Sequence, residues 1–322
     1  MGRTRNLEKL PRKTNKSIII IVISIIIMVI LSYFIINNYL SIQKELKENK
    51  ELNAKLNNLK NENIKELTKG KELSVELEKY NNIDSEISKT KEEVFKLAKE
   101  LETKITNNET KYKIAYLTFD DGPYYSTNQV LDILKKYKIK ATFFTIGLDK
   151  DICYDNNKYS CAETYKKIVD NGHTIANHTY SHAIFRGLYT SPDSFIHQVK
   201  LQQDLIEKRT GVKTNILRFP GGSATAKALA GYNSAEQIKQ KLKENGYGWV
   251  DWSAQDGDGG YLPNYDTGWK NLTSTIDENI EVILFHDYST VTISLLPDAI
   301  KYLEDRDYIL LPLFYDSIKV NK

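Results

Sequence analysis

The 322-residue sequence has few of the residues that mark specialised protein classes. It contains 2 cysteines, 7 prolines and 16 glycines. Two cysteines are too few for a disulfide scaffold, and they lack the four-ligand spacing of a structural zinc site. The low glycine and proline contents exclude a collagen-like chain, and a hydrophobic content of 41% excludes a wholly disordered one.

The chain also has almost no excess of charge. Its formal net charge is +3, but residues 1–16 hold six basic residues and one acidic residue, so the rest of the chain carries −2. Phosphate binding needs a concentrated basic face. This nearly neutral body therefore argues against nucleic acid as a partner.

One long apolar run is present near the start of the chain. From Ser17 to Ile36 there are 20 residues without a charge. At about 1.5 Å per residue, a helix of this length matches the hydrocarbon core of a bilayer, about 30 Å thick. The run ends in bulky residues rather than the small residues of a signal-peptide cleavage site. We therefore expect a retained transmembrane helix at residues 17–37 as a single-pass cell-membrane anchor, with the basic residues 1–16 in the cytoplasm and the rest of the chain outside the cell.

Residues 38–110 form a second block, which is rich in charge. Residues 41–110 contain 14 lysines and 15 acidic residues but no proline. Leucines recur at roughly helical spacings, which predicts a long amphipathic helix of up to about 105 Å. Two interpretations are open: a coiled-coil stalk that forms a homodimer, or a solvated spacer helix.

Residues 111–322 alternate short apolar runs with amphipathic segments. The expected strands are Ile114–Phe119, Thr142–Ile146, Thr174–Ala176, Ile216–Phe219, Gly248–Trp252, Val282–Phe285 and Ile309–Leu313. One expected helix begins at Ser126, and the others cover Glu163–Asp170, Pro192–Arg209, Ala235–Glu244 and Leu296–Glu304. This alternation predicts an α/β fold with a parallel sheet, open or closed into a barrel, whose chemistry lies at the carboxyl ends of the strands.

Four of the expected strands end in polar groups. The residues concerned are the pair Asp120-Asp121, the histidines His178 and His182, Arg218 with the following Pro220-Gly221-Gly222, and His286. Paired aspartates can simply cap a turn. Two histidines four residues apart suit one metal ion if the segment turns helically. Because all these groups fall where a strand meets a loop, we expect a single site.

Four segments then carry a specific resemblance. Thr118-Phe119-Asp120-Asp121-Gly122, His178-Thr179-Tyr180-Ser181-His182, Arg218-Phe219-Pro220-Gly221-Gly222 and Leu284-Phe285-His286 resemble, in order and spacing, the motifs of polysaccharide deacetylases of the NodB-homology type, carbohydrate esterase family 4. The resemblance covers nearly all of residues 112–313. It implies a distorted (β/α) barrel with one divalent metal ion, usually Zn²⁺. Membrane-anchored bacterial members with this layout look like peptidoglycan N-acetylglucosamine deacetylases.

The resemblance also implies a role for each matching residue. Asp121, His178 and His182 match the metal ligands, and Asp120 matches the general base, which Arg218 holds in place. His286 matches the general acid that protonates the departing amine. The backbone N–H of Gly221 matches a donor to the oxyanion, and Leu284 matches the wall of the acetyl pocket.

One motif departs from the family pattern. Its aspartate, which tunes the catalytic histidine, is normally followed by tryptophan. Here Asp251-Trp252 has the literal pattern, whereas alignment on the following turn makes Asp258 the equivalent, with Gly259 in the tryptophan position. We favour Asp258, because many relatives reach this aspartate several residues after an Asp-Trp-Asn sequence.

Three functions are compatible with these motifs. The leading one is removal of acetyl groups from the N-acetylglucosamine of cell-wall peptidoglycan. A second keeps the chemistry but changes the glycan to a chitin-like polymer, poly-N-acetylglucosamine or acetylated xylan. The third is a non-catalytic envelope protein that only binds glycan. In addition, we expect Cys153 and Cys161 to form a disulfide, since exported compartments permit one.

Overall fold

The computed structural model describes residues 91–147, 161–262 and 264–322, together with residues 23, 28, 31, 37–38, 40–44, 46–48 and 50–55. Residues 1–71 and 72–322 form two separate compact units. Among the described residues, no helix has both the length and the apolar character that a membrane crossing requires. Most of the expected span at residues 17–37, much of the expected stalk, and Cys153 lie outside the described residues, so these expectations stay predictions.

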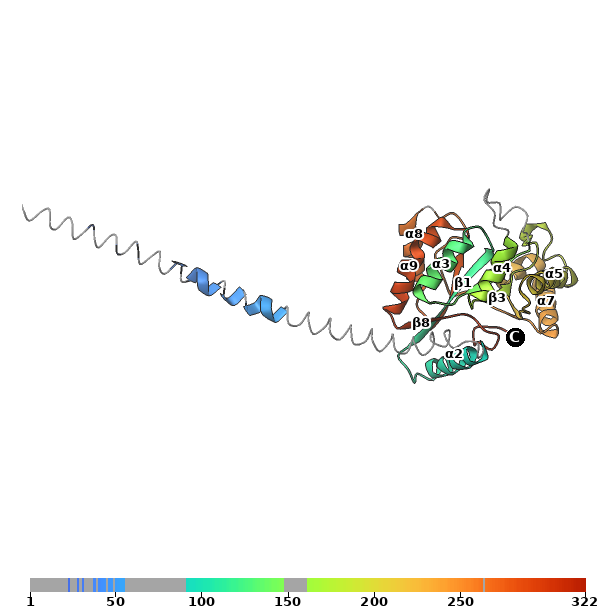
Figure 1. Cartoon of the computed structure of the whole chain (residues 1–322), viewed down its shortest axis with the longest axis horizontal. Coiled ribbons are helices and arrows are strands. Elements are labelled where there is room, and N and C mark those ends of the chain that lie inside the picture. Colours follow the sequence, from blue (N-terminus) through green and yellow to red (C-terminus); the bar gives the residue numbers. More distant parts are fainter. Residues whose placement is uncertain are drawn as a thin grey trace, which may run out of the picture. The chain divides into compact units, whose positions relative to one another are not determined.

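The second unit alternates strands and helices along the chain (Figure 1). Its strands are β1 (Lys113–Gly122), β2 (Thr142–Thr145), β3 (Thr174–Asn177), β4 (Ile216–Leu217), β5 (Gly248–Trp249), β6 (Ala254–Gln255), β7 (Ile280–His286) and β8 (Tyr308–Leu311). Its α-helices are α2 (Lys91–Thr106), α3 (Thr127–Tyr137), α4 (Cys161–Asp170), α5 (Pro192–Thr210), α6 (Gly222–Ala230), α7 (Tyr232–Glu244), α8 (Tyr265–Thr275) and α9 (Thr290–Glu304). A 3₁₀ helix, η2, covers Ile184–Arg186.

The strands form one parallel sheet in the order β5-β4-β3-β2-β1-β7-β6, with β8 beside β1. β7 pairs along one edge of β1, whereas β8 and then β2 share its other edge. No strand pairing joins β5 to β6 in the described part of the chain. The sheet is therefore a curled, incompletely closed barrel, which confirms the expected parallel α/β architecture.

The side chains of β1 alternate between two apolar clusters, one on each face of the strand. Ala115, Leu117 and Phe119 belong to the apolar cluster that also contains residues of α3 and α9, whereas Ile114 and Tyr116 belong to a second cluster. Successive side chains of a strand point to opposite faces. Thr118 and Asp120 continue the face of Ile114 and Tyr116, so Asp120 points to the barrel interior at the carboxyl end of the strand.

Helix α2 closes the opposite end of this interior. Its buried residues Ala98, Leu101 and Ile105 pack in the same cluster as Ile114 and Tyr116. Glu102, which is 4% exposed, accepts hydrogen bonds from the Tyr116 hydroxyl (2.6 Å), the Ser317 hydroxyl (2.5 Å) and the Ile318 backbone N–H (3.0 Å). This finding corrects the expected domain boundary at residue 110: residues 91–106 are part of the packed catalytic unit, because their apolar stripe completes its core.

We expect the substitution Leu101→Ala to reduce the free energy of unfolding of the catalytic unit by about 2–5 kcal/mol, since it leaves a cavity in a packed core. Denaturant titration followed by tryptophan fluorescence would measure this change. Lys104→Ala is the matched control, because Lys104 is exposed on the same helix and such changes usually stay within about 0.5 kcal/mol. Equal stability of the two variants would mean that α2 is only a stalk.

Candidate active site

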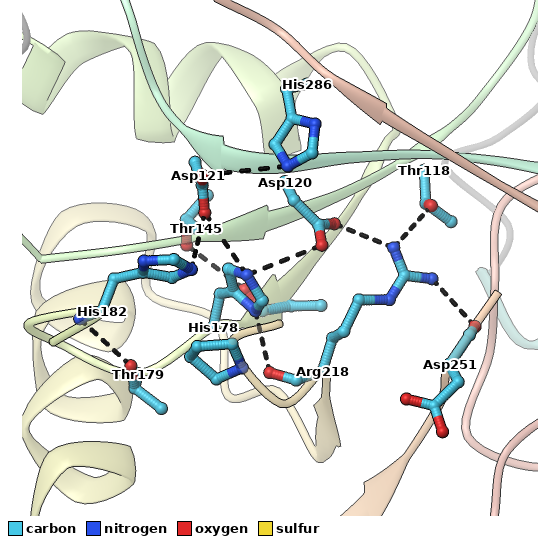
Figure 2. Close-up of polar contacts among 12 residues, drawn as sticks. Thr118, Asp120, Asp121, Thr145, His178, Thr179, His182, Arg218, Asp251 and His286 are labelled. Carbon is cyan, nitrogen blue, oxygen red and sulfur yellow. Dashed lines mark hydrogen bonds and ion pairs between the residues drawn. The ribbon is translucent and has the colours of Figure 1, made fainter. Parts of the chain in front are cut away.

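The first two site residues come from a bulge at the end of β1. The pairing of β1 with β2 shifts register between Asp120 and Gly122, and Asp121 has a φ of 71°. A bulge re-aims the extra residue. As a result, the carboxylates of Asp120 and Asp121 are adjacent in sequence but face different partners (Figure 2).

The two histidines come from a tight loop after β3, not from a helical turn as the sequence suggested. Asn177 Oδ1 accepts the backbone N–H of Thr179 (2.9 Å), and Thr179 Oγ1 accepts that of His182 (3.3 Å). Thr179 and His182 both have positive φ, at 67° and 47°. Side chains other than glycine rarely adopt this conformation, and such strained residues gather at functional sites. The loop places the rings of His178 and His182 4.9 Å apart, centroid to centroid.

Asp121, His178 and His182 converge on one point. Each offers one ligand atom, and these atoms all lie within 4.8 Å of one another. Asp121 Oδ1 lies 3.3 Å from His178 Nε2 and 3.1 Å from His182 Nε2. This oxygen is buried and has no hydrogen-bond partner. An orphaned carboxylate oxygen facing two imidazole nitrogens fits a divalent cation.

Both histidines direct Nε2 toward Asp121 Oδ1. His178 Nδ1 lies 2.8 Å from the carbonyl oxygen of Arg218 and donates to it, so Nε2 is the ring nitrogen left to face Asp121. Burial, followed by repulsion from His178, lowers the pKa of His182 to about 4. The His182 ring can therefore serve as a metal ligand at neutral pH without losing a proton.

Arg218 links the interior of the barrel to the carboxylate of Asp120. Its side chain is fully buried, and Nη1 donates to Asp120 Oδ1 (2.9 Å) and to Thr118 Oγ1 (2.7 Å). The carbonyl oxygens of Val250 and Asp251 accept from its other nitrogens, both at 3.2 Å. A buried charge is tolerated when it is paired and fully hydrogen-bonded. Arg218 therefore holds Asp120 Oδ1 in place and leaves Oδ2 directed toward the histidines (Figure 2).

His286 ends β7 directly beside Asp120, with which it pairs in register. Asp258 binds it twice: Oδ1 lies 2.7 Å from His286 Nδ1, and Oδ2 accepts the His286 backbone N–H at 2.7 Å. Burial lowers the pKa of His286, but the hydrogen bond and charge of Asp258 outweigh it and raise the pKa to about 9. The imidazolium is thus the stable form near neutral pH, and its Nε2 lies 3.8 Å from Asp121 Oδ2.

The two candidate aspartates of the fourth motif have separate partners. The structure brings Asp258 to His286, whereas the carboxylate of Asp251 accepts the backbone N–H of Ser223 (2.9 Å) and the Ser223 hydroxyl. Figure 2 shows Asp251 apart from the histidines, on the other side of the Arg218 guanidinium. Gly259 stands where the family usually has tryptophan, and a Cβ there would lie 3.0 Å from His286 Cε1. Any side chain at this position would press on the imidazole.

Gly221 and Leu284 each lie a few residues along the chain from a member of the polar cluster. Gly221 has a φ of 74° and caps the start of α6, in the loop that Asp251 holds through Ser223. Leu284 precedes His286 by two residues on β7, so both side chains lie on the same face of the strand. Sequence reasoning did not single out Thr118, although its position two residues before Asp120 places it on the same face.

Comparisons with known proteins agree with this geometry. The sequence model of the polysaccharide deacetylase family matches residues 107–237. A peptidoglycan-N-acetylglucosamine deacetylase of Bacillus cereus is 31% identical over 62% of this chain and 69% of its own length. The peptidoglycan-N-acetylmuramic acid deacetylase PdaC of Bacillus subtilis is 31% identical over 67% of this chain and 44% of its own length.

The catalytic unit is also similar to a solved structure. The catalytic domain of a peptidoglycan N-acetylglucosamine deacetylase from Eubacterium rectale superimposes with a TM-score of 0.58 at 30% identity, over 65% of this chain and 92% of that one. The matched sequence, the curled parallel sheet and the clustered motif residues point to one family. The chain belongs to the polysaccharide deacetylases of carbohydrate esterase family 4, which have the NodB-type fold.

Proposed function

We propose that the chain is a metal-dependent hydrolase that removes acetyl groups from the N-acetylglucosamine residues of cell-wall peptidoglycan. The observation that supports this most is the cluster of Asp121, His178 and His182, which lies close to both the Asp120–Arg218 pair and the His286–Asp258 pair. Amide hydrolysis needs an activated water molecule and a proton for the departing amine. These groups can meet both needs within one site.

Asp121, His178 and His182 would hold the metal ion. One carboxylate oxygen and two imidazole nitrogens form a donor set that is typical of catalytic zinc, and three protein ligands leave room for water and substrate. A bound divalent ion, Zn²⁺ in this proposal, would lower the pKa of its water and polarise the acetyl carbonyl group. The unpartnered Oδ1 of Asp121 is the atom that this role explains.

Asp120 acts as the general base in this proposal. Its Oδ1 is occupied by Arg218, and its Oδ2 lies 3.6 Å from His178 Nε2, on the side of the metal ligands. Oδ2 is therefore the oxygen that accepts a proton from the attacking water. The Arg218 guanidinium keeps the carboxylate oriented while the proton is transferred.

His286 acts as the general acid. Its Nδ1 is bonded to Asp258, so Nε2, which faces the cluster, is the atom that donates a proton to the departing amine. An amine is a poor leaving group unless it is protonated as the C–N bond breaks. We assign the oxyanion contact to the backbone N–H of Gly221 and the acetyl pocket wall to Leu284, as the family resemblance implies.

The substrate assignment rests on the relatives, whose names include deacetylases of both sugars of peptidoglycan. The test is product analysis after incubation of the purified full chain with peptidoglycan, chitin oligomers and acetylated xylan, with and without a chelator. We expect acetate release and free amines on glucosamine, only with metal present. Free amines on muramic acid would correct the sugar, and deacetylation of xylan alone would correct the polymer. Binding without acetate release would favour a non-catalytic glycan-binding protein.

The anchor is part of the same proposal. The uncharged run at residues 17–37 follows a strongly basic segment, which supports a single-pass membrane protein with the catalytic unit outside the cell. Residues beyond the anchor would then join it to the barrel, as a dimerising coiled coil or as a single spacer helix. Protease added to intact cells should digest residues 38–322. Release into the medium of a form that begins near residue 38 would contradict the anchor.

A further inference from the structure

A second buried carboxyl group lies behind the His286–Asp258 pair. Asp256 is fully buried, and its Oδ1 accepts the backbone N–H of Asp258 at 3.1 Å. Gly257, with a φ of +87°, makes the bend between them, and a Cβ at this position would lie 2.8 Å from Asn271 Nδ2. The Asp-Gly-Asp turn therefore directs two carboxyl groups to the same place, although the proposed active site uses only that of Asp258.

The hydroxyl of Thr292 lies between the two carboxyl groups. Thr292 is the third residue of α9 and is fully buried. Its Oγ1 lies 2.7 Å from Asp256 Oδ2 and 2.6 Å from Asp258 Oδ2. Both distances are those of hydrogen bonds between oxygens. A threonine hydroxyl has a single proton, and two ionised carboxylates have none to add.

Two short oxygen–oxygen contacts therefore need a second proton, which must be on one of the carboxyl groups. Asp258 receives two N–H bonds from His286, one of them from the imidazole, so both of its oxygens already act as acceptors. Asp256 receives one backbone N–H and faces no cation directly. Burial and the adjacent charge of Asp258 raise the pKa of Asp256, which agrees with the proton being there.

We propose that Asp256 is a neutral carboxylic acid that donates its proton to Thr292 Oγ1, so that Thr292 donates in turn to Asp258 Oδ2. The resulting chain, Asp256 to Thr292 to Asp258 to His286, fixes the rotamer of Asp258 and thereby the orientation of the His286 ring. Asp256 and Thr292 are positioning residues, since neither touches the substrate. This role rests on the proposed function, whereas the protonation of Asp256 does not.

Among the described residues, the groups packed around Asp256 are one carboxylate, one amide and one hydroxyl. Asp258 on the same loop is its titratable neighbour, with His286 of β7 beyond it. Helix α8 contributes the neutral amide of Asn271, which donates to the Asp256 carbonyl oxygen at 2.9 Å. Helix α9 contributes only the Thr292 hydroxyl.

The protonation state can be tested without substrate. Infrared spectra of the full chain at neutral pH should contain a protonated-carboxyl band that decreases in Asp256→Asn. Because burial also raises the pKa of Asp287, to about 7, that residue can contribute a band that persists in the variant. A wild-type spectrum without a protonated-carboxyl band, or one whose band does not decrease in Asp256→Asn, would overturn the proposal. This measurement stays decisive even if the chain turns out to have no deacetylase activity.

The positioning role is tested by turnover with conservative variants. Asn at 256 keeps a donor for Thr292, so Asp256→Asn should retain turnover within a few fold, whereas an ionised Asp256 would make this change costly. Thr292→Val should lower turnover about tenfold or more, because it removes a hydrogen bond to a charged group, and Thr292→Ser should restore it. Thr290→Val is the matched control, since Thr290 is exposed in the same helix. Equal turnover of Thr292→Val and Thr292→Ser, or a large loss in Asp256→Asn, would refute the role.

Discussion

Replacement of His182 by alanine is expected to remove most of the bound metal and to reduce turnover by more than about 100-fold. Loss of an outer-shell partner of a metal ligand already costs about 10–100-fold in affinity or activity, and His182 supplies a direct ligand in our proposal. His182 is partly exposed and lies in the loop after β3 rather than in the apolar core, so the fold should persist. The metal content of the dialysed protein and its turnover would measure the two effects.

The matched control is His197→Ala, because His197 is exposed on α5 and outside the cluster. It should retain both metal and turnover. Wild-type protein treated with a chelator should lose activity and regain it when a divalent ion is added. Normal metal content in His182→Ala, or full activity of the demetallated wild type, would end the assignment of these residues as ligands.

Much of the barrel could be predicted because its strands are short, apolar and separated by helices. The expected runs at Ile114–Phe119, Thr142–Ile146 and Val282–Phe285 overlap β1, β2 and β7. Parallel strands bring their carboxyl ends together, so residues far apart in sequence could be expected in one site. The clustering of Asp121, His178 and His182 follows from that rule. The conformation of the loop after β3, in which Thr179 and His182 have positive φ, could not be predicted in this way.

Helix α8 was not expected and α9 was expected only from Leu296, because both have sequences with weak helical preference. Helix α8 contains glycine and four threonines or serines among its 11 residues, and its position depends on the capping side chain of Asn264 and on burial of Leu272. Helix α9 begins at Thr290, well before the expected start at Leu296, and includes Pro297. Proline normally marks a helix boundary. In both helices, packing against the barrel outweighs local preference.

The partners of the site residues were the least predictable part. Arg218 binds groups from β1 and from the segment after β5, and Thr292 binds two carboxyl groups from the loop after β6. These contacts join residues 32 to 100 positions apart in sequence. No periodicity within one element can indicate them, because they depend on how the sheet closes.

The pH dependence of turnover should separate the two aspartates of the fourth motif. Asp120 must be unprotonated and His286 protonated, so turnover should follow a bell-shaped pH profile. The alkaline limb reports loss of the His286 proton, and Asp258 is what raises this pKa to about 9 against the effect of burial. Asp258→Asn removes that charge, so the pKa of His286 falls and the alkaline limb moves to lower pH. Asp251→Asn should leave the limb in place, since Asp251 binds Ser223.

Direct removal of the acid completes this test. His286→Ala should lower kcat by about 10²–10⁴-fold, the usual cost of removing a positioned acid or base. Its metal content should match the wild type, because Asp121, His178 and His182 are intact. A shift of the alkaline limb in Asp251→Asn but not in Asp258→Asn would assign the tuning role to Asp251. Near-normal turnover of His286→Ala would mean that another group protonates the departing amine, because an amine does not leave at this rate without a proton donor.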